Sequence, residues 1–474
     1  MARQVGRASK RGPAVAIFAI LLALTPPLGG VRAADPSNNH PSVVVILTDD
    51  QRWDQLWSMP HVQQSLVERG VTFKNAFVVN SLCCPSRASI LTGGYSHTTG
   101  VYSNNPPHGG FDSFRPDEHS TVATWLQKAG YTTALVGKYL NHYGTAGKAG
   151  YIPPGWSRWI ALAIDTVKYY DYPLNVDGTI EHYGHRPQDY STDVLTNRAV
   201  NVIHETKGPM FLYYAPSAPH GPAHPDPRDV NRFPDLKPYR PPNYDEQDVS
   251  DKPAWVRSLP LMSSGREAAI DAFRRRQLQS LVEVDRSVGR IVQALADTHR
   301  LRNTMIVFTS DNGIAEGEHR WTGKKDAYEE SVRVPMVIRY DPMGTAQRSD
   351  THLVMNIDLA PTFAALVGVG APNADGRSLL PLIDGSSTSW RTDFLIEHLK
   401  DAVAPIPTFC AVRNEQYLYV VYGTGEEELY DLSQDPYELQ NVASDPSQTV
   451  TLEQMRMRTK QLCNPPPPGF TFPY

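Results

Sequence analysis

Four short apolar runs, each followed at once by polar side chains, stand out in the pattern of hydrophobic and polar positions. They are rich in β-branched and aromatic residues and cover Val43–Leu47, Thr133–Val136, Met210–Tyr214 and Thr304–Phe308. Such near-continuous runs are typical of strands in a sheet that is covered on both faces. The polar residues after each run would then meet at the carboxyl edge of an open α/β sheet, where such folds place functional groups.

Helical spacing separates these runs. Apolar residues recur every three or four positions within Leu278–Leu295, which predicts a long amphipathic helix over about 271–297. A shorter helix is predicted over 121–129, with Ser120 as its N-cap and Gly130 just past its end. Strands that alternate with helices in this way favour an α/β fold class.

Two later stretches differ from this alternation in composition and pattern. Residues 216–260 are rich in proline and charge and lack periodicity, which predicts a long loop of the kind that lines a binding site. Further on, the runs 409–412 and 417–421 predict antiparallel strands. We therefore predict a large domain over 34–390 and a smaller antiparallel-sheet domain over 391–474.

The first part of the chain has the composition of a secretory signal peptide, predicted over 1–33. A basic start precedes an apolar stretch at 14–24, and small residues offer a cleavage point near Ala33. A membrane anchor is the alternative, but the apolar stretch is short and Pro26-Pro27 follows it. We expect an exported protein, periplasmic or secreted, with no stable membrane span. The sequence has no N-x-S/T acceptor site, which favours a bacterial source.

The charge of the chain limits its partners. Removing residues 1–33 takes away five basic groups and no acids, so the formal net charge changes from −5 to −10. An acidic protein is a poor general binder of nucleic acids or sulfated polyanions. We therefore expect no nucleic-acid partner, and any bound anion has to be met by a local cluster of metal and basic side chains.

The chain has four cysteines: Cys83, Cys84, Cys410 and Cys463. Two disulfides are one interpretation, since an exported protein can keep them. Adjacent cysteines bridge each other only with strain, however. We therefore predict a single disulfide between Cys410 and Cys463 that ties the C-terminal module together.

Two of the strand ends carry candidate metal ligands. Asp49 and Asp50 follow the first apolar run, and Asp311 and Asn312 follow the last. Either pair alone fits an ordinary capped turn. Together they supply three carboxylates and an amide oxygen, a set that suits Ca²⁺ or Mg²⁺ and would not select zinc.

Residues 83–94 contain C-x-P-S-R followed by Thr-Gly, and this run resembles the signature of the type I sulfatases. Further similarities to that family lie at 47–51, 308–313, 317–329 and 428–438. The resemblance implies a large mixed central sheet sandwiched by helices, of the alkaline phosphatase and sulfatase type, with a smaller C-terminal antiparallel sheet. In that family a formylglycine-generating enzyme oxidises the first cysteine of the motif to formylglycine, whose hydrate attacks sulfate esters.

Carried over position by position, the resemblance implies a site with Ca²⁺ or Mg²⁺ as cofactor. The implied metal ligands are Asp49, Asp50, Asp311, Asn312 and the formylglycine at Cys83. The implied catalytic residues are Cys83, Arg87, Lys138, His220 and Lys324. Arg87 would hold the hydrate of the nucleophile, the two lysines would bind sulfate oxygens, and His220 would face the leaving-group oxygen.

This sequence departs from the family pattern at one position. Arylsulfatases commonly place a histidine two residues after the motif lysine, and here Leu140 stands two residues after Lys138. Asn141 or His142 would take over a substrate contact at that point. His319 matches a recurrent family position and is a third substrate candidate.

Within the family, the residues around Cys83 and Lys138 are most similar to N-acetylglucosamine-6-sulfatases and heparan 6-O-endosulfatases. This resemblance implies a sulfated sugar or aryl sulfate substrate, with N-acetylglucosamine 6-sulfate as the specific expectation. One alternative keeps the fold and hydrolyses phosphonate esters or phosphodiesters. Another is a non-catalytic binder of sulfated glycans in which Cys83 stays a thiol. A redox or zinc element at Cys83-Cys84 is disfavoured because no second cysteine pair has ligand spacing.

Overall fold

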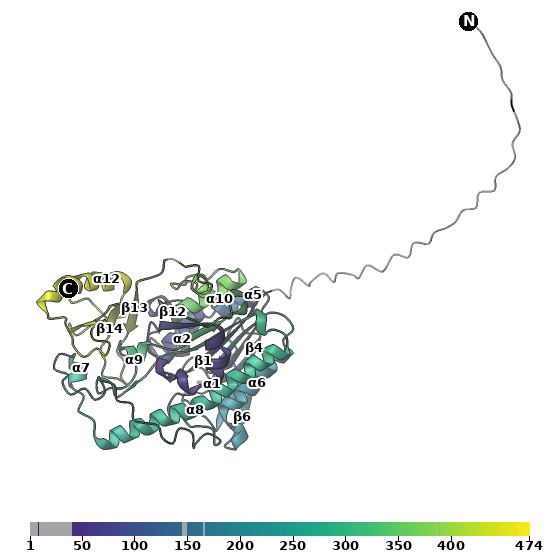
Figure 1. The fold of residues 1–474 in the computed structure, drawn as a ribbon, viewed down its shortest axis with the longest axis horizontal. Helices are drawn as coiled ribbons and strands as arrows, with labels where there is room; N and C mark the ends of the chain where they lie inside the picture. Colours follow the sequence, from purple (N-terminus) through teal and green to yellow (C-terminus); the bar gives the residue numbers. More distant parts are fainter. Residues whose placement is uncertain (1–7, 9–39, 145–148, 165, 388) are drawn as a thin grey trace, which may run out of the picture.

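The computed structural model describes residue 8 and residues 40–144, 149–164, 166–387 and 389–474. Apart from residue 8, the predicted signal segment lies outside these residues. The described chain forms a broad body around a large sheet, with the C-terminal segment gathered at one end (Figure 1). No helix among the described residues is long and apolar enough to span a membrane.

A ten-stranded mixed sheet forms the centre of the molecule, which confirms the predicted fold class. Its five middle strands, β8, β1, β7, β3 and β4, run parallel, so their carboxyl ends lie along one edge. All four predicted apolar runs are among these five. In spatial order the strands are β12 (Arg348–Met355), β2 (Val71–Phe77), β11 (Met336–Arg339), β8 (Thr304–Ser310), β1 (Ser42–Thr48), β7 (Met210–Ala215), β3 (Thr132–Gly137), β4 (Arg158–Leu162), β5 (Tyr172–Val176) and β6 (Thr179–Tyr183).

Helices cover both faces of this sheet, because β1 is apolar on both sides. Val43, Val45 and Leu47 pack with α2 (Cys83–Thr92), α5 (Val122–Lys128) and α10 (Leu359–Val367). Val44 and Ile46 pack with α1 (Pro60–Ser65), α6 (Ser191–Glu205) and α8 (Ser264–Asp297). Figure 1 shows α5 and α10 on the opposite side of the strands from α6 and α8. Burying both faces of β1 explains its uninterrupted apolar run.

Two predicted helix starts need correction. The helix α8 begins at Ser264, where the side chain of Ser263 accepts a hydrogen bond from the Arg266 backbone N–H. Its first four residues are Ser, Gly, Arg and Glu, so apolar periodicity does not reveal this start. The N-cap of α5 is Thr121 and not Ser120, because Thr121 and Thr124 form a reciprocal capping box.

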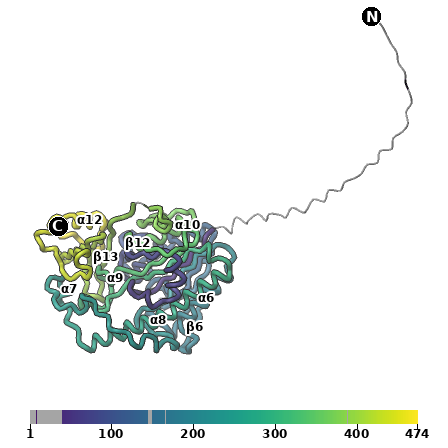
Figure 2. Tube along the Cα trace, viewed as in Figure 1, coloured from purple at the N-terminus to yellow at the C-terminus, as the bar shows by residue number. Residues whose placement is uncertain are grey.

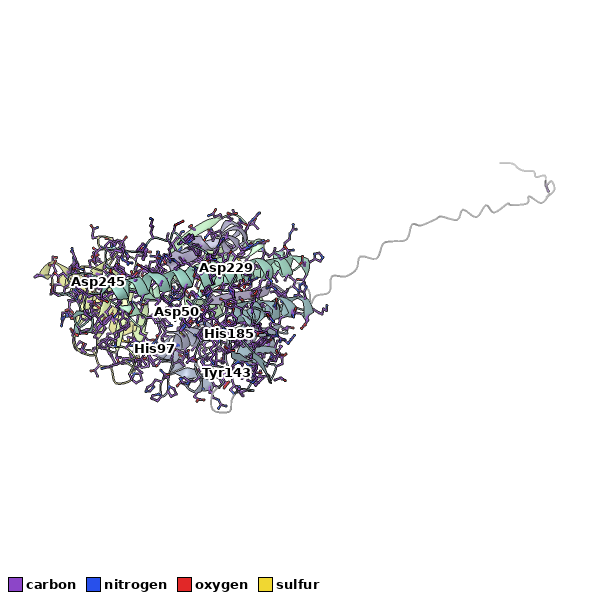
Figure 3. The ribbon with its side chains drawn as sticks, turned by 90° about the horizontal axis from the view of Figure 1, so that it is seen from below. Asp50, His97, Tyr143, His185, Asp229 and Asp245 are labelled. Atoms are coloured by element: carbon purple, nitrogen blue, oxygen red, sulfur yellow. A yellow bond between two sulfur atoms is a disulfide. The ribbon has the colours of Figure 1, made fainter. Side chains whose placement is uncertain are left out.

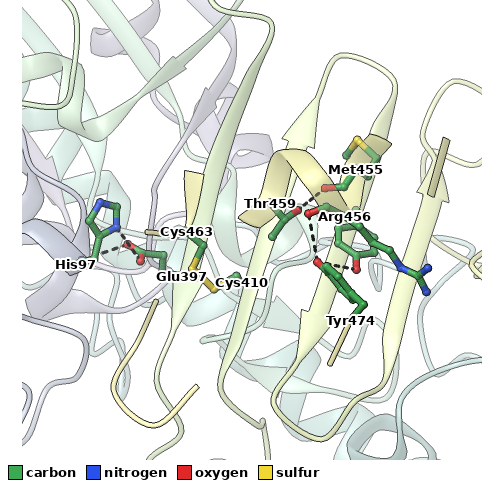
Figure 4. Close-up of a disulfide and its surroundings, with 9 residues drawn as sticks. His97, Glu397, Cys410, Met455, Arg456, Thr459, Cys463 and Tyr474 are labelled. Carbon is green, nitrogen blue, oxygen red and sulfur yellow. Dashed lines mark hydrogen bonds and ion pairs between the residues drawn. A yellow bond between two sulfur atoms is a disulfide. The ribbon is translucent and has the colours of Figure 1, made fainter. Parts of the chain in front are cut away.

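The second sheet has four antiparallel strands at the C-terminal end, as predicted. They are β13 (Asp393–His398), β14 (Phe409–Asn414), β15 (Tyr417–Tyr422) and β16 (Glu427–Asp431). The helix α12 (Thr449–Leu462) packs on this sheet, and a disulfide joins Cys410 of β14 to Cys463 just after the helix (Figure 4). The trace in Figure 2 shows this segment, in yellow, at one end of the body. The boundary at residue 391 stays a prediction.

Short elements complete the described fold. The segment 216–260 is a long loop interrupted only by one helical turn, α7 (Ala254–Arg257), in agreement with the sequence. The other short helices and strands are α3 (Ser96–Thr99), α4 (Gly110–Phe114), α9 (Glu329–Val332), α11 (Leu380–Ile383), β9 (Ala315–Glu316) and β10 (Thr322–Gly323). The 3-10 turns are η2 (Trp53–Ser58), η3 (Val67–Arg69), η4 (Arg115–Asp117), η5 (Pro187–Asp189), η6 (Leu301–Asn303), η7 (Asp341–Met343), η8 (Asn356–Asp358) and η9 (Pro446–Gln448).

Candidate active site

The two acidic strand ends meet because β1 and β8 are parallel neighbours in register. Thr48 pairs with Ser310, so the next residues of both strands lie side by side. The backbone N–H of Asp50 donates to Asp311 Oδ1 at 3.1 Å, and Asn312 Nδ2 donates to Asp50 Oδ1 at 2.6 Å. In Figure 3, Asp50 lies towards the middle of the molecule. Residues separated by 262 positions thus form one polar cluster.

The next parallel strands bring basic groups to the same edge. Lys138 directly follows β3, and its Nζ lies 2.5 Å from Asp49 Oδ2. His220 lies in the loop after β7, and its Nε2 is 3.6 Å from Asp50 Oδ2. The other ring nitrogen of His220, Nδ1, lies 2.7 Å from the Gly221 carbonyl oxygen. Donation from Nδ1 to that carbonyl leaves Nε2 as the atom that faces the site.

Cys83 is the first residue of α2, a helix that is buried along its whole length. Its Sγ lies 3.6 Å from Asp49 Oδ1 and 2.8 Å from Lys324 Nζ. Lys324 Nζ also forms an ion pair with Asp50. Because a helix N-terminus carries a partial positive charge, this position favours an anionic nucleophile or a bound anion.

Arg87 lies one helical turn after Cys83 and is fully buried. Its Nε donates to Asp311 Oδ2 at 2.7 Å, and its Nη1 donates to the Lys138 carbonyl oxygen at 2.9 Å. A buried guanidinium needs such partners to offset its loss of hydration. Arg87 therefore connects α2 with the ends of β8 and β3.

The charges in the cluster shift one another's pKa. Burial acts to raise the pKa of Asp49, but Lys138, His220 and Arg87 outweigh it and hold that pKa well below its ordinary value. Burial, followed by repulsion from Asp49, raises the pKa of Asp311. Burial opposes protonation of His220, yet the carboxylates of Asp50 and Asp49 raise its pKa to about 9. The carboxylates of Asp49 and Asp50 and the basic side chains therefore hold each other in charged forms, whereas Asp311 is more easily protonated.

The residues of the cluster fit a hard divalent cation. One ligand atom from each of Asp49, Asp50, Cys83 and His220 lies within 4.8 Å of the others. Asn312 is fully buried, and its Oδ1 has no hydrogen-bond partner among the described residues. An amide oxygen left unpaired beside three carboxylates is an available ligand for Ca²⁺ or Mg²⁺. Lys138 and Lys324 also contact the carboxylates of this cluster.

A pocket of about 410 Å³ opens beside Lys138 and His220. Asn141 lines it, and the Asn141 Oδ1 atom is buried without a hydrogen-bond partner among the described residues. Ser217 also lines the pocket, and its Oγ is buried without a hydrogen-bond partner among the described residues. The remaining lining residues are Tyr139, Leu140, Leu162, Ile164, Thr166, Val167, Gly221 and Pro222. The volume matches that of small-ligand pockets, and the lining combines apolar walls with a few polar groups.

Two of the predicted substrate contacts, His142 and His319, have other partners than the polar cluster around Asp49. His142 is partly buried, and its Nε2 lies 2.8 Å from Asn105 Oδ1. His319 is buried, with Nδ1 2.7 Å from Glu246 Oε2 and its ring 4.2 Å from the Tyr328 ring. No contact of His319 with the cluster around Asp49 is found among the described residues. Its role as a substrate contact stays a prediction.

Sequence reasoning missed several residues that shape the site. Ser217 is a single serine in a loop, and no spacing or composition singles it out. Tyr169 donates from its hydroxyl to the His220 carbonyl oxygen at 2.7 Å and so steadies the loop that carries His220. A sequence pattern does not reveal this contact, because the two residues lie 51 positions apart.

A family model for sulfatases matches residues 41–369, and a second model, described as the C-terminal part of N-sulphoglucosamine sulphohydrolase, matches residues 317–464. The first match covers more than half of the chain and includes every member of the polar cluster. The chain belongs to the sulfatase family.

Curated relatives include the sulfatases that the sequence resembles. An N-acetylglucosamine-6-sulfatase from Capra hircus is 33% identical over 464 residues, which cover 87% of this chain and 82% of that protein. An extracellular sulfatase SULF-1 homolog from Drosophila melanogaster is 35% identical over 372 residues and 76% of this chain. This chain spans only 33% of that Drosophila protein and 56% of a Caenorhabditis elegans Sulf-1 homolog.

A solved structure supports the fold. A protein in complex with its substrate D-glucosamine-2-N,6-O-disulfate matches with a TM-score of 0.77 at 24% identity, covering 90% of this chain and 98% of that chain. At this identity the match shows a shared fold and no more. The likeness agrees with the mixed central sheet and the separate four-stranded sheet described above.

Proposed function

We propose that this sulfatase hydrolyses the sulfate ester of a sugar, with formylglycine formed from Cys83 as the nucleophile and Ca²⁺ as the bound cation. The observation that carries the proposal is the position of Cys83. It begins a buried helix, beside the carboxylates of Asp49 and Asp50, and its Sγ lies 2.8 Å from Lys324 Nζ. A nucleophile among fixed cations is what transfer of an anionic sulfuryl group requires.

Each ligand in the proposed cation site comes from a strand end or from α2. Asp49, Asp50, Asp311, Asn312 and the modified Cys83 would hold the ion. Bound there, Ca²⁺ or Mg²⁺ would lower the pKa of a hydroxyl on the nucleophile and polarise the sulfate ester. Ca²⁺ is preferred because hard oxygen donors suit its adaptable coordination geometry, whereas Mg²⁺ requires a near-ideal octahedron.

The two lysines would bind the sulfate. In the described structure Lys138 and Lys324 form ion pairs with Asp49 and Asp50. With a cation held by those carboxylates, the ammonium groups would be available to the sulfate oxygens. Fixed donors of this kind stabilise charge that develops on a transferring group. Arg87 keeps its bond to Asp311 and neutralises charge at the base of the site.

His220 would protonate the leaving-group oxygen. Its Nε2 faces the cluster while Nδ1 lies 2.7 Å from the Gly221 carbonyl oxygen. This contact orients the ring, so an imidazolium at this position presents its Nε2–H to the sugar oxygen of the ester. The family's second histidine is absent at Leu140, and we assign the neighbouring substrate contact to Asn141, which lines the pocket.

The proposed substrate is a sugar sulfated at the 6-position, with N-acetylglucosamine 6-sulfate as the first candidate. Relatives with that printed activity and the pocket of about 410 Å³ beside Lys138 and His220 support it. Asn141 and Ser217 offer polar atoms to sugar hydroxyls, and Leu162, Ile164 and Val167 offer an apolar wall to the ring. We also propose export from a bacterial cell, and maturation by a formylglycine-generating enzyme.

A substrate panel tests this proposal. The matured enzyme is assayed with N-acetylglucosamine 6-sulfate, the 4-sulfate and 6-phosphate of that sugar, an aryl sulfate and a phosphodiester. We expect the highest kcat/KM for the 6-sulfate, with stoichiometric release of sulfate. Faster turnover of the phosphodiester would favour the phosphonate and phosphodiester alternative. Binding of sulfated sugars without any release of sulfate would favour a non-catalytic binder.

A further inference from the structure

A second group of potential metal ligands lies apart from the cluster around Asp49. His319, Glu330 and Glu438 each offer one ligand atom, and these three atoms all lie within 4.8 Å of one another. All three side chains are buried, and Glu438 and His319 are fully so. They come from distant parts of the chain: Glu330 belongs to α9, and Glu438 follows β16 of the C-terminal sheet.

The hydrogen bonds of His319 fix which ring nitrogen faces this group. Nδ1 lies 2.7 Å from Glu246 Oε2, so the Nδ1–H donates to that carboxylate. In the neutral ring Nε2 is then an acceptor, and it faces Glu438 Oε2 at 4.0 Å. A histidine that donates one N–H to a carboxylate while its other nitrogen faces further acceptors has the arrangement common at metal ligands.

Several acceptor atoms in this group have no partner. Glu330 Oε2 and Glu438 Oε1 are buried without a hydrogen-bond partner among the described residues, and so is Asn243 Oδ1. Asn243 is fully buried, and its amide lies in the group, with Nδ2 3.3 Å from His319 Nε2 and 3.1 Å from Glu330 Oε1. Buried unpaired acceptors cost free energy, so a cation or protons have to be present.

The neighbouring basic side chains are engaged with other carboxylates. Lys252 Nζ lies 3.4 Å from Glu246 Oε1, and Arg413 Nε lies 3.0 Å from Glu329 Oε1. Arg52 Nη1 lies 2.9 Å from Glu318 Oε1. Among the described residues Glu330 forms no ion pair, and Glu438 forms one only with His319, at 4.0 Å.

The two carboxyl groups do not ionise readily without further charge compensation. Burial, followed by repulsion from Glu318, raises the pKa of Glu330 to about 7. Burial and then repulsion from Glu330 raise the pKa of Glu438 well above its ordinary value. A divalent cation between them would remove this repulsion, as like-charged carboxylates at metal sites require.

We propose that His319, Glu330 and Glu438 bind a structural Zn²⁺ ion. One imidazole nitrogen and two carboxylates suit zinc better than calcium, which prefers an all-oxygen set. Ligand atoms at about 2.0–2.2 Å from the metal require these side chains to draw together from their present separation. Rotation of the Asn243 amide would present its free Oδ1 as a fourth ligand, and water is the alternative.

Such an ion would fasten the C-terminal sheet to the segment that carries Lys324. That lysine lies between His319 and Glu330 in sequence, and Glu438 comes from beyond the second sheet. The zinc site would therefore stabilise the docking of the two sheets. It would act on Lys324 by positioning its loop and not by contact with the substrate.

Metal analysis of the full-length purified protein tests the site. We expect one equivalent of zinc per chain by mass spectrometry, and several degrees of increase in Tm when ZnCl₂ is added to chelator-treated protein. Glu438→Gln should lose the zinc and the Tm increase while keeping the calcium. A matched control is Glu283→Gln, in another buried acidic group, because Arg228 and Arg286 already pair with Glu283. This control should keep its zinc.

X-ray absorption at the zinc edge, measured on the unmutated protein, independently identifies the ligands of the zinc ion. A spectrum with one imidazole among nitrogen and oxygen ligands would support the site. Absence of zinc binding and of the Tm increase would overturn it, and so would unchanged zinc content in Glu438→Gln. The calcium content and the sulfatase activity are recorded on the same samples, so failure of this inference is distinguishable from failure of the proposed catalytic function.

Discussion

Lys324 illustrates how single residues join the parts of the candidate active site. It contacts Cys83, which lies 241 positions earlier, and it forms an ion pair with Asp50. The neighbouring Lys325 points to a different partner, Asp401, at 2.5 Å. Two adjacent lysines therefore have different roles, and their comparison separates catalysis from general charge effects.

Replacing Lys324 by methionine should lower kcat/KM for the sulfate ester by about 10²–10³-fold, because a fixed cation at the sulfate is lost. Lys325→Met is the control and should lower kcat/KM by less than tenfold. Steady-state kinetics with a circular-dichroism check of folding measures both. An equal decrease of kcat/KM in the two variants would show that Lys324 supports only the local structure and does not bind the sulfate.

Buried His398 makes a residue-scale prediction about pH. Its burial lowers the pKa of the ring to about 3, whereas the unfolded chain has a pKa of about 6.5. The unfolded state therefore takes up the proton first, and the free energy of unfolding contributed by this site falls as the pH drops from about 6.5 towards 3.

His398→Leu should reduce the loss of stability between pH 7 and pH 4, as measured by urea-unfolding midpoints. His185→Leu, at an exposed histidine, serves as the control for removing an imidazole, and its loss of stability in acid should exceed that of His398→Leu. If His398→Leu loses as much stability between pH 7 and pH 4 as the unmutated protein, groups other than His398 cause that loss, and the prediction is wrong.

The sequence predicted part of the site at this scale and missed the rest for a physical reason. Asp49 and Asp311 each follow an apolar strand, so their position at a common edge could be inferred. Their partners His220 and Lys324 were found only through family resemblance. Ser217 and Asn243 were not found, because a polar residue in a loop has no periodic signal and its contacts depend on tertiary packing.

At the scale of elements, the ends of the parallel strands determine where the side chains of the candidate active site lie. Gly137 closes β3 directly before Lys138 and has a φ of +126°. A Cβ there would lie 2.0 Å from the Ala215 carbonyl oxygen of β7. Glycine is therefore required to let the two strand ends approach each other and to aim Lys138 at Asp49.

Gly137→Ala should lower the free energy of unfolding by roughly 2–4 kcal/mol, from backbone strain and the steric clash together. It should also lower kcat because Lys138 is displaced. Gly208→Ala is a suitable control, because a Cβ at Gly208 meets nothing within 4 Å. Chemical denaturation of both proteins measures the difference, and equal stability would contradict the close approach.

Strands were easier to predict than helix limits. The run at 43–47 identifies β1 because both of its faces are buried, and periodicity located the core-facing half of α8. The polar start of α8 escaped notice, since its stability depends on capping by Ser263 and not on an apolar stripe. Capping hydrogen bonds of this type determine where a helix begins, and the amino-acid composition of the segment gives little sign of them.

At the scale of the whole molecule, the disulfide binds the C-terminal module into one unit. Cys410 and Cys463 enclose a segment with a sequence separation of 53 residues, and this segment includes β15, β16 and α12. Closing a loop of this length restricts the unfolded chain.

Replacing both cysteines by alanine should lower the free energy of unfolding by about 2–4 kcal/mol and leave kcat/KM of the folded protein within a few-fold. Differential scanning calorimetry and kinetics at low temperature measure the two effects. An unchanged Tm would show that the sheet and α12 hold the module together without the bridge.

The central claim is that Cys83 becomes the nucleophile through conversion to formylglycine. Trypsin releases it in the peptide 75–87, which also carries Cys84 as an internal control. Mass spectrometry of this peptide, from protein made in the presence of a formylglycine-generating enzyme and treated with a thiol-alkylating reagent, tests the claim directly. The account predicts an aldehyde at Cys83 and alkylation at Cys84 alone. Alkylation of both cysteines in protein that still releases sulfate would contradict it.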